Sequence, residues 1–270
     1  MSARLATRMV AKPWGRADLP APFTGLSPDR IGEVWFEPPP VLDRLLVKYI
    51  FTSEPLSVQV HPTDDQTLAA GQGRQGKEEC WLVIAAEPGA RLGIGLREPA
   101  SPEELRAAAL DGSIEDLLEW HPVTAGDFFY IPANTVHAIG GGISLVEVQQ
   151  NSDITYRLYD YGRPRELHLD AGLAVAQGAP HPANCRLQVP GEGAVQLVDG
   201  PLFRLDRIAG QPAAEVLARY GEAPVLAVPL RGTVRIGDEA IAAGECGVAG
   251  SLAELAVPDD ALVLIAQPLG

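Results

Sequence analysis

Positive charge is scarce in this 270-residue chain. It has 21 Lys and Arg residues against 35 Asp and Glu residues, which leaves a formal net charge of −14. Binding to a nucleic-acid backbone needs clustered cations, so this composition argues against a nucleic-acid partner. The composition is otherwise that of a globular protein, at 46% hydrophobic and 21% charged residues, and this excludes a disordered or fibrous chain.

Cysteines and long apolar runs are also scarce. The three cysteines, Cys80, Cys185 and Cys246, are odd in number and lack the spacing of a disulfide framework. No stretch approaches the roughly 18 uncharged apolar residues of a membrane span. The basic N-terminal stretch has no apolar segment of the kind found in secretory signals. We therefore expect no membrane partner, a cytoplasmic location and reduced thiols.

Turn-forming residues, in contrast, are abundant. The 28 glycines and 24 prolines separate short segments that are apolar or alternate between apolar and polar residues. Regularly spaced short strands of this kind favour an all-β fold such as a sandwich, barrel or jelly roll. The predicted strands are 44–51, 56–62, 80–86, 91–96, 128–133, 143–150, 203–209, 223–230, 232–237, 239–245 and 261–268.

One segment breaks the strand pattern and predicts a two-helix insert over 101–120. Ser101 and Glu104 form a capping box with Pro102 at the first helical position. The amino-acid composition of the chain changes after about Leu167, where a stretch rich in Ala, Gly and Pro precedes further predicted strands. We therefore expect an N-terminal domain over 1–168, and a linker with a second, metal-free β domain over 169–270.

All five histidines lie in the first two thirds of the chain, so a transition-metal site is expected there. Gln59 and His61 are two residues apart on a predicted strand and project from the same face. On their own, these side chains fit a solvated face better than a cavity. A second pattern changes the balance: Gly126 begins an apolar strand that leads through Pro132 and Asn134 to His137.

This second pattern resembles the second sequence motif of the cupins, with Asn134 in place of a glycine. The pair Gln59 and His61 stands where many cupins have two histidines. Cupins are β jelly rolls that hold a metal inside the barrel on these positions. After Gly, Asn is the residue that best tolerates positive φ, which suits the turn before His137.

Four tracts in order extend the resemblance: LSVQVHP (56–62), GKEECW (76–81), GDFFYIPANTVHAIG (126–140) and VEVQQNSDITYRLYDYGR (146–163). Together with Lys12-Pro13-Trp14-Gly15 they resemble the type I phosphomannose isomerases, in their short bacterial form. The resemblance implies two cupin-like jelly-roll domains and one Zn²⁺ per chain. It also implies interconversion of mannose 6-phosphate and fructose 6-phosphate through an enediol(ate), by a protein that acts as a monomer.

The resemblance places the zinc ligands of this family on Gln59, His61, Glu79 and His137. Two imidazoles, a carboxylate and an amide oxygen leave room for substrate, as a catalytic zinc site requires. Glu78 competes with Glu79 for the carboxylate position. Adjacent residues of a strand face opposite ways, so only one of the two can enter the barrel; we favour Glu79.

The resemblance also implies the substrate-binding and catalytic groups. Phosphate contacts map onto Ser57, Arg157 and Arg163, with Lys77 reaching into the same cavity. Trp14, Glu33 and Trp35 map near the cavity mouth, although Trp35 fits the core equally well. The implied catalytic groups are Arg157, Lys77, Glu147 and Asp153, with the proton-transferring base unassigned among the last three and a zinc-bound hydroxide. The competing interpretation is that the two arginines only form ion pairs with Asp153, Asp160 or Glu166.

One position departs from the family. Longer members carry a histidine, implicated in opening the sugar ring, where this chain has Gly76. A sugar-phosphate-binding cupin without catalysis therefore stays open. A metal-dependent cupin oxygenase also stays open, because cupin barrels host many reactions.

Overall fold

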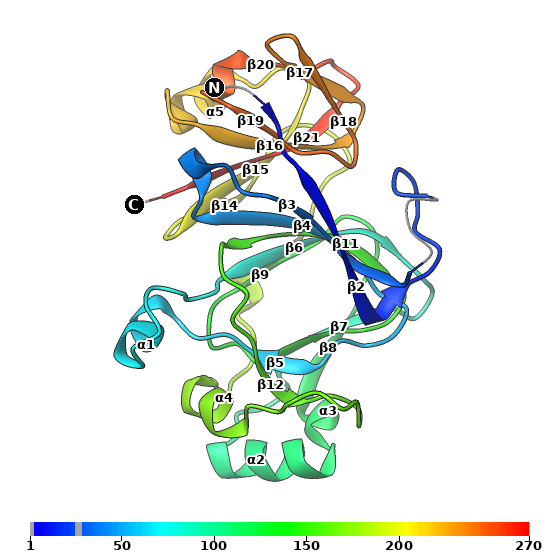
Figure 1. The fold of residues 1–270 in the computed structure, drawn as a ribbon, viewed down its shortest axis with the longest axis vertical. Helices are drawn as coiled ribbons and strands as arrows, with labels where there is room; N and C mark the ends of the chain where they lie inside the picture. The colour runs from blue at the N-terminus through cyan, green and yellow to red at the C-terminus, as the bar shows by residue number, and fades with distance from the viewer. Residues whose placement is uncertain (1–2, 25–28, 270) are drawn as a thin grey trace.

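The computed structural model describes residues 3–24 and 29–269. Its N-terminal barrel is made of two antiparallel sheets that face each other (Figure 1). The seven-stranded sheet runs in the order β13 (Arg186–Gln188), β9 (Asp127–Ile131), β6 (Glu79–Ala86), β11 (Ile143–Gln150), β4 (Leu45–Phe51), β3 (Ile31–Phe36) and β2 (Thr7–Arg16). The five-stranded sheet runs in the order β12 (Tyr156–Tyr159), β5 (Val58–Val60), β10 (His137–Ile139), β7 (Arg91–Leu96) and β8 (Leu118–Pro122).

Apolar residues from both sheets form the core inside this barrel. Ile50 and Trp81 come from the larger sheet, and Leu92 and Ile139 come from the smaller one. Strand β4 is buried along its whole length. Its alternate side chains face the barrel interior or the opposite surface of the sheet, and both surfaces are covered.

Helices cover the outer face of the five-stranded sheet. α2 (Pro102–Asp111), α3 (Ile114–Leu117) and α4 (Leu169–Val175) supply apolar side chains that pack with residues of β5, β7 and β12. The predicted capping box is confirmed, because Ser101 and Glu104 bond to each other's backbone N–H groups. The predicted insert is too long at its end: residues 118–120 belong to β8, which pairs with β7.

The C-terminal half forms a second pair of β-sheets. A six-stranded sheet has the order β1 (Ala3–Arg4), β19 (Gly247–Ala249), β16 (Val225–Arg231), β21 (Leu262–Pro268), β15 (Phe203–Ala209) and β14 (Val195–Asp199). A three-stranded sheet has the order β18 (Glu239–Ala242), β17 (Thr233–Ile236) and β20 (Leu255–Ala256). The predicted all-β class with two cupin-like jelly rolls is confirmed.

The remaining elements are short helices. They are α1 (Asp64–Ala69), α5 (Ala214–Tyr220) and the 3₁₀ helices η1 (Pro40–Leu42), η2 (Ala183–Cys185) and η3 (Leu252–Glu254). None of the helices in the described part of the chain is long and apolar enough to cross a membrane.

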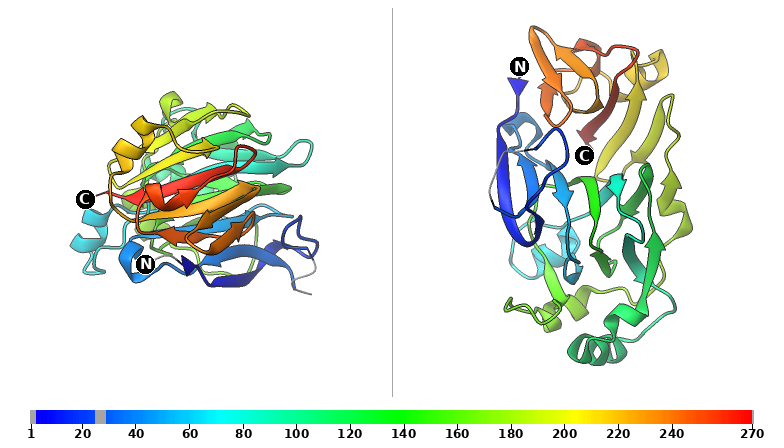
Figure 2. Two further views of the ribbon diagram at one scale, coloured as in Figure 1. Left: turned by 90° about the horizontal axis from the view of Figure 1, so that it is seen from above. Right: turned by 90° about the vertical axis from the view of Figure 1, so that its right-hand side faces the viewer.

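The two halves share one apolar core. The outer surface of the seven-stranded sheet contributes Val47 and Phe51, and the six-stranded sheet contributes Phe203, Leu226 and Leu264. Figure 2 shows the C-terminal strands stacked above the N-terminal barrel. The division at residue 168 stays a prediction, and strand pairing crosses it: β1 joins the C-terminal sheet and β13 joins the N-terminal barrel.

Because this core is shared, we expect one cooperative unfolding transition. Phe203 is fully buried and its ring lies 6.0 Å from that of Tyr130. Truncation of a buried Phe to Ala typically costs about 3–5 kcal/mol. Phe203→Ala should therefore lower the melting temperature of the whole chain in calorimetry. Leu110→Ala, at a site that is 68% exposed, is the matched control and should change little. Separate melting of two units would contradict the shared core.

Candidate metal centre and adjoining cavity

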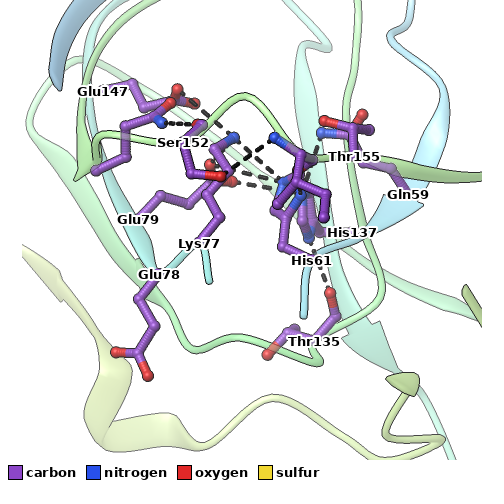
Figure 3. Close-up of polar contacts among 12 residues, drawn as sticks. Gln59, His61, Lys77, Glu78, Glu79, Thr135, His137, Glu147, Ser152 and Thr155 are labelled. Carbon is purple, nitrogen blue, oxygen red and sulfur yellow. Dashed lines mark hydrogen bonds and ion pairs between the residues drawn. The ribbon is translucent and has the colours of Figure 1, made fainter. Parts of the chain in front are cut away.

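Two histidines and a glutamate meet inside the N-terminal barrel (Figure 3). Ligand atoms of His61, Glu79 and His137 all lie within 4.8 Å of one another, and all three residues are buried. His61 directly follows β5, His137 begins β10 and Glu79 begins β6 of the opposite sheet. Closure of the barrel therefore brings together groups that lie up to 76 positions apart in the sequence.

Local pairing sets the positions of the histidines. His137 lies opposite Gln59 in the β5–β10 ladder, and the Gln59 Nε2 to His137 Nε2 distance is 3.2 Å. Asn134 has a φ of 72° in the turn before His137, as the resemblance to a glycine position predicts. The Asn134 backbone N–H donates to the carbonyl of His61 at 2.7 Å, which ties the turn to the other histidine.

Both imidazoles are oriented for metal binding through Nε2. His61 Nδ1 lies 2.8 Å from the carbonyl oxygen of Ile154, and His137 Nδ1 lies 2.8 Å from that of Thr135. A ring nitrogen that donates to a carbonyl leaves a lone pair on the other nitrogen. In this structure the Nε2 lone pair of His61 faces Lys77 Nζ at 3.2 Å, and that of His137 faces Gln59 Nε2. Burial lowers the pKa of His61 well below its usual range and that of His137 to about 4. The rings are thus neutral ligands at neutral pH.

The carboxylate of Glu79 faces the two rings at distances of 3.8 Å to His61 Nε2 and 3.4 Å to His137 Nε2. Neither of its oxygens accepts a hydrogen bond among the described residues. Lys77 Nζ forms an ion pair with it at 2.5 Å, without hydrogen-bond geometry. Burial, then the charge of Glu147, raises the pKa of Glu79 to about 7. Buried carboxylate oxygens without hydrogen bonds, beside two imidazole lone pairs, fit a divalent cation.

Glu78 lies on the other side of the strand. Its side chain points away from the histidines, and the hydroxyl of Tyr130 donates to it. Gln59 lies beside the centre, but its Oε1 accepts from Ser57 Oγ at 3.1 Å and its Nε2 faces His137. A 180° rotation of the amide would exchange these two atoms and turn Oε1 toward His137.

A cavity of about 230 Å³ adjoins the metal centre. It brings together eight of the residues that the sequence singles out: Trp14, Glu33, Ser57, Gln59, Lys77, Glu147, Asp153 and Arg157. Trp35 also lines the cavity, and sequence reasoning missed Lys12, Lys48, Thr155 and Arg165 as lining residues. Lys48 carries a recognisable signal, because it is a charged residue in the middle of the apolar segment 44–51.

Buried ions in the cavity wall are paired across neighbouring strands. Glu147 lies opposite Lys48 on β4 and opposite Trp81 on β6. It accepts from Lys48 Nζ at 2.9 Å and from Trp81 Nε1 at 3.0 Å, and Lys77 Nζ lies 3.9 Å away. Burial disfavours ionisation of Glu147, but the charges of Lys48 and Lys77 outweigh it and lower the pKa of Glu147 to about 2. Glu147 is therefore an anion that orders two cations.

Arg163 is not among the residues that line the cavity. Its guanidinium binds Asp160 at 3.2 Å, Glu54 at 3.3 Å and the carbonyl of Pro55 at 2.8 Å. These contacts agree with the competing interpretation of Arg163 as an ion-pairing residue. Arg165, two positions further on, lines the cavity beside Arg157.

Gly76 lies against the start of α1, which explains why no side chain occupies this position. Its N–H donates to Asp64 Oδ1 at 2.8 Å. A Cβ at Gly76 would lie 2.2 Å from the backbone nitrogen of Asp64 and 2.6 Å from the carbonyl carbon of Thr63. A histidine here would require movement of the α1 backbone.

Comparison with known proteins gives relatives of one kind. Mannose-6-phosphate isomerase of Streptococcus mutans is 40% identical over 212 residues, which are 74% of this chain and 66% of that protein. Mannose-6-phosphate isomerase ManA of Bacillus subtilis is 44% identical over 139 residues, which are 49% of this chain and 44% of that protein. The matched regions thus span about two thirds of one relative and under half of the other. No family model matches the chain.

Solved structures share the fold. The crystal structure of mannose 6-phosphate isomerase from Bacillus subtilis superposes with a TM-score of 0.74 at 22% identity and covers 98% of both chains. A zinc-bound mannose 6-phosphate isomerase superposes with a TM-score of 0.70 at 14% identity, again over 98% of both chains. At these identities the superpositions support the architecture of both halves.

We expect metal affinity to depend on pH through Glu79. At pH 6 this carboxyl holds a proton that an incoming cation must displace, whereas at pH 8 it does not. Binding of Zn²⁺ should weaken by roughly tenfold per pH unit below 7 and level off above it. Competition with a chromophoric chelator in pH-matched buffers measures this effect. Glu79→Gln should bind Zn²⁺ more weakly at both pH values; if it kept the full pH dependence, the assignment to Glu79 would be wrong.

Gly76→Ala should destabilise the fold, because the added methyl group overlaps backbone atoms that cannot rotate away. Overpacking of this kind typically costs about 1–3 kcal/mol. Gly191→Ala is the matched control, since a Cβ there has no neighbour within 4 Å. Urea denaturation of the two variants measures the difference. Equal stability of both would show that the α1 backbone yields easily.

Proposed function

We propose that the chain is a member of the mannose-6-phosphate isomerase family, and that it interconverts mannose 6-phosphate and fructose 6-phosphate with one Zn²⁺ per chain. The observation that carries the proposal is the buried group of His61, Glu79 and His137 beside a cavity lined by cations. The sequence resemblance and the curated relatives support the same activity.

We assign the zinc to His61, Glu79 and His137, with the amide oxygen of Gln59 as the fourth ligand after rotation of its side chain. The buried, neutral imidazoles and the carboxylate without hydrogen bonds support this assignment. When bound, zinc supplies Lewis-acid stabilisation of the negative charge that develops on the oxygens at C1 and C2 of the sugar.

Lys77 and Arg157 are the protein groups that stabilise the negative charge on the oxygens at C1 and C2. Burial lowers the pKa of Lys77, but the charges of Glu147 and Glu79 outweigh this effect and the pKa is raised. Lys77 is therefore a cation and a hydrogen-bond donor rather than a base. Fixed donors aimed at developing charge are among the largest contributions to catalysis.

Among the carboxylates that line the cavity, Asp153 fits the proton-transferring base. Glu147 is committed to Lys48 and has a pKa of about 2, which makes it a weak base. Glu33 is bonded by Trp35 and Lys12. Asp153 lines the cavity without an ion pair in the described part of the chain. An aldose–ketose isomerase needs one group that takes a proton from one carbon and returns it to the next.

The phosphate group fits Arg165, with Ser57 Oγ as a further donor, and Arg157 is kept for the charge at C1 and C2. A planar guanidinium offers paired donors that match two phosphate oxygens. Arg165 replaces Arg163 in this role, because Arg163 is held by Glu54, Asp160 and Pro55. A monomeric state and a cytoplasmic location remain expectations of the sequence.

A coupled assay on the purified chain tests the function. Fructose 6-phosphate should form from mannose 6-phosphate. This activity should be lost after treatment with EDTA and should return with Zn²⁺ but not with Mg²⁺. His137→Ala should lose both bound zinc and activity. Bound zinc without turnover would favour the alternative of a binding protein, for which Gly76 is the supporting observation. Oxygen uptake with Fe²⁺ would favour an oxygenase.

A further inference from the structure

The segment that follows β12 gathers two arginines on one buried carboxylate. Asp160 is 2% exposed. Arg165 Nε donates to Asp160 Oδ2 at 2.6 Å, and Arg165 Nη2 donates to Oδ1 at 2.5 Å. Arg163 Nη1 donates to the same Oδ1 at 3.2 Å. One carboxylate therefore holds two guanidinium groups, and its geometry with Arg165 is bidentate.

The two arginines point to different surroundings. Arg165 lines the cavity together with Arg157, and its side chain keeps 26% of its surface exposed. Arg163 binds Glu54 and the carbonyl of Pro55 in the β4–β5 connection. Arg163 thus attaches the segment to the barrel, whereas Arg165 lines the cavity.

The backbone is bent in order to place these groups. Arg163 N–H donates to the carbonyl of Asp160 at 3.0 Å, and the turn between them has φ values of +55° at Tyr161 and +75° at Gly162. Positive φ at both central positions is the signature of a type I′ turn. This conformation is unfavourable for a tyrosine, and it persists only where surrounding contacts maintain it. In this structure the turn brings Arg163 and Arg165 back to Asp160.

We infer that Asp160 is a positioning residue that fixes the guanidinium of Arg165 at the cavity wall, so that it receives the phosphate of the substrate. The inference rests on the proposed function and adds a residue that does not itself touch the substrate. A bidentate pair holds both the position and the plane of the guanidinium. It therefore removes rotamer freedom that Arg165 would otherwise lose on binding an anion.

The direction in which a substitution of Asp160 changes phosphate binding distinguishes a positioning role from a purely electrostatic one. Asp160→Asn removes one negative charge close to Arg157 and Arg165. If Asp160 acted only through its charge, the variant would leave the cavity more positive and bind a phosphate more tightly. If Asp160 acts by orienting Arg165, binding weakens in spite of the more positive cavity.

The test compares the zinc-loaded wild type with Asp160→Asn, using mannose 6-phosphate turnover and inhibition by inorganic phosphate. We expect KM and the phosphate inhibition constant to rise by about tenfold, the size of a lost charge-assisted orientation, with kcat changed less and zinc content unchanged. Glu54→Gln is the matched control, since it removes the other carboxylate of Arg163 and leaves the Asp160–Arg165 pair intact; both constants should stay within twofold.

A double-mutant cycle makes the result specific to Arg165. In an Arg165→Lys background, which cannot form the bidentate pair, Asp160→Asn should have little further effect on KM. Should Asp160→Asn fail to fold, Asp160→Glu keeps the charge while displacing the guanidinium, and it should also raise KM. A lower KM in Asp160→Asn, or equal effects in both backgrounds, would overturn the inference. A wild type without turnover would instead refute the proposed function.

Discussion

Charged side chains inside the N-terminal barrel alternate in sign, and their pairing lets two sheets close over an interior that holds these ions beside an apolar core. Lys48 pairs with Glu147, Lys77 approaches both Glu147 and Glu79, and Glu79 faces the two histidines. A buried charge without a partner is costly, and removal of one partner leaves the other uncompensated. The positions of these residues therefore depend on one another, and the metal centre is one end of this chain of ion pairs.

Apolar packing against the outside of the barrel offsets the free-energy cost of burying these charges. The seven-stranded sheet packs its outer surface against the C-terminal sheet through Val47, Phe51 and Phe203. The helices cover the outer face of the smaller sheet through residues such as Leu105 and Leu173. Because both sheets are supported from outside by apolar contacts, the interior surface can carry ligands and cations. This gives the C-terminal half a structural part in the site, although it supplies none of the residues that line the cavity.

Local sequence patterns predicted much of the fold. The strands 91–96, 143–150 and 203–209 coincide with β7, β11 and β15, because apolar runs between turn residues determine where a strand can lie. The predicted end of the helical insert is wrong, because residues 118–120 pair with β7 as part of strand β8. Propensity along the chain does not contain such pairing between distant segments.

The sequence by itself determined the all-β class, because the period of the strands and the turns between them are local properties. It pointed to His61, Glu79 and His137 only through the resemblance of its ordered motifs to a known family. The tertiary structure decided which neighbours of these residues reach the cavity. Lys48 enters it through the β4–β11 pairing with Glu147. Arg165 reaches it and Arg163 does not, because a tight turn returns both to Asp160 while Glu54 and Pro55 hold Arg163 aside. Such choices depend on contacts between segments far apart in the chain, which no local pattern encodes.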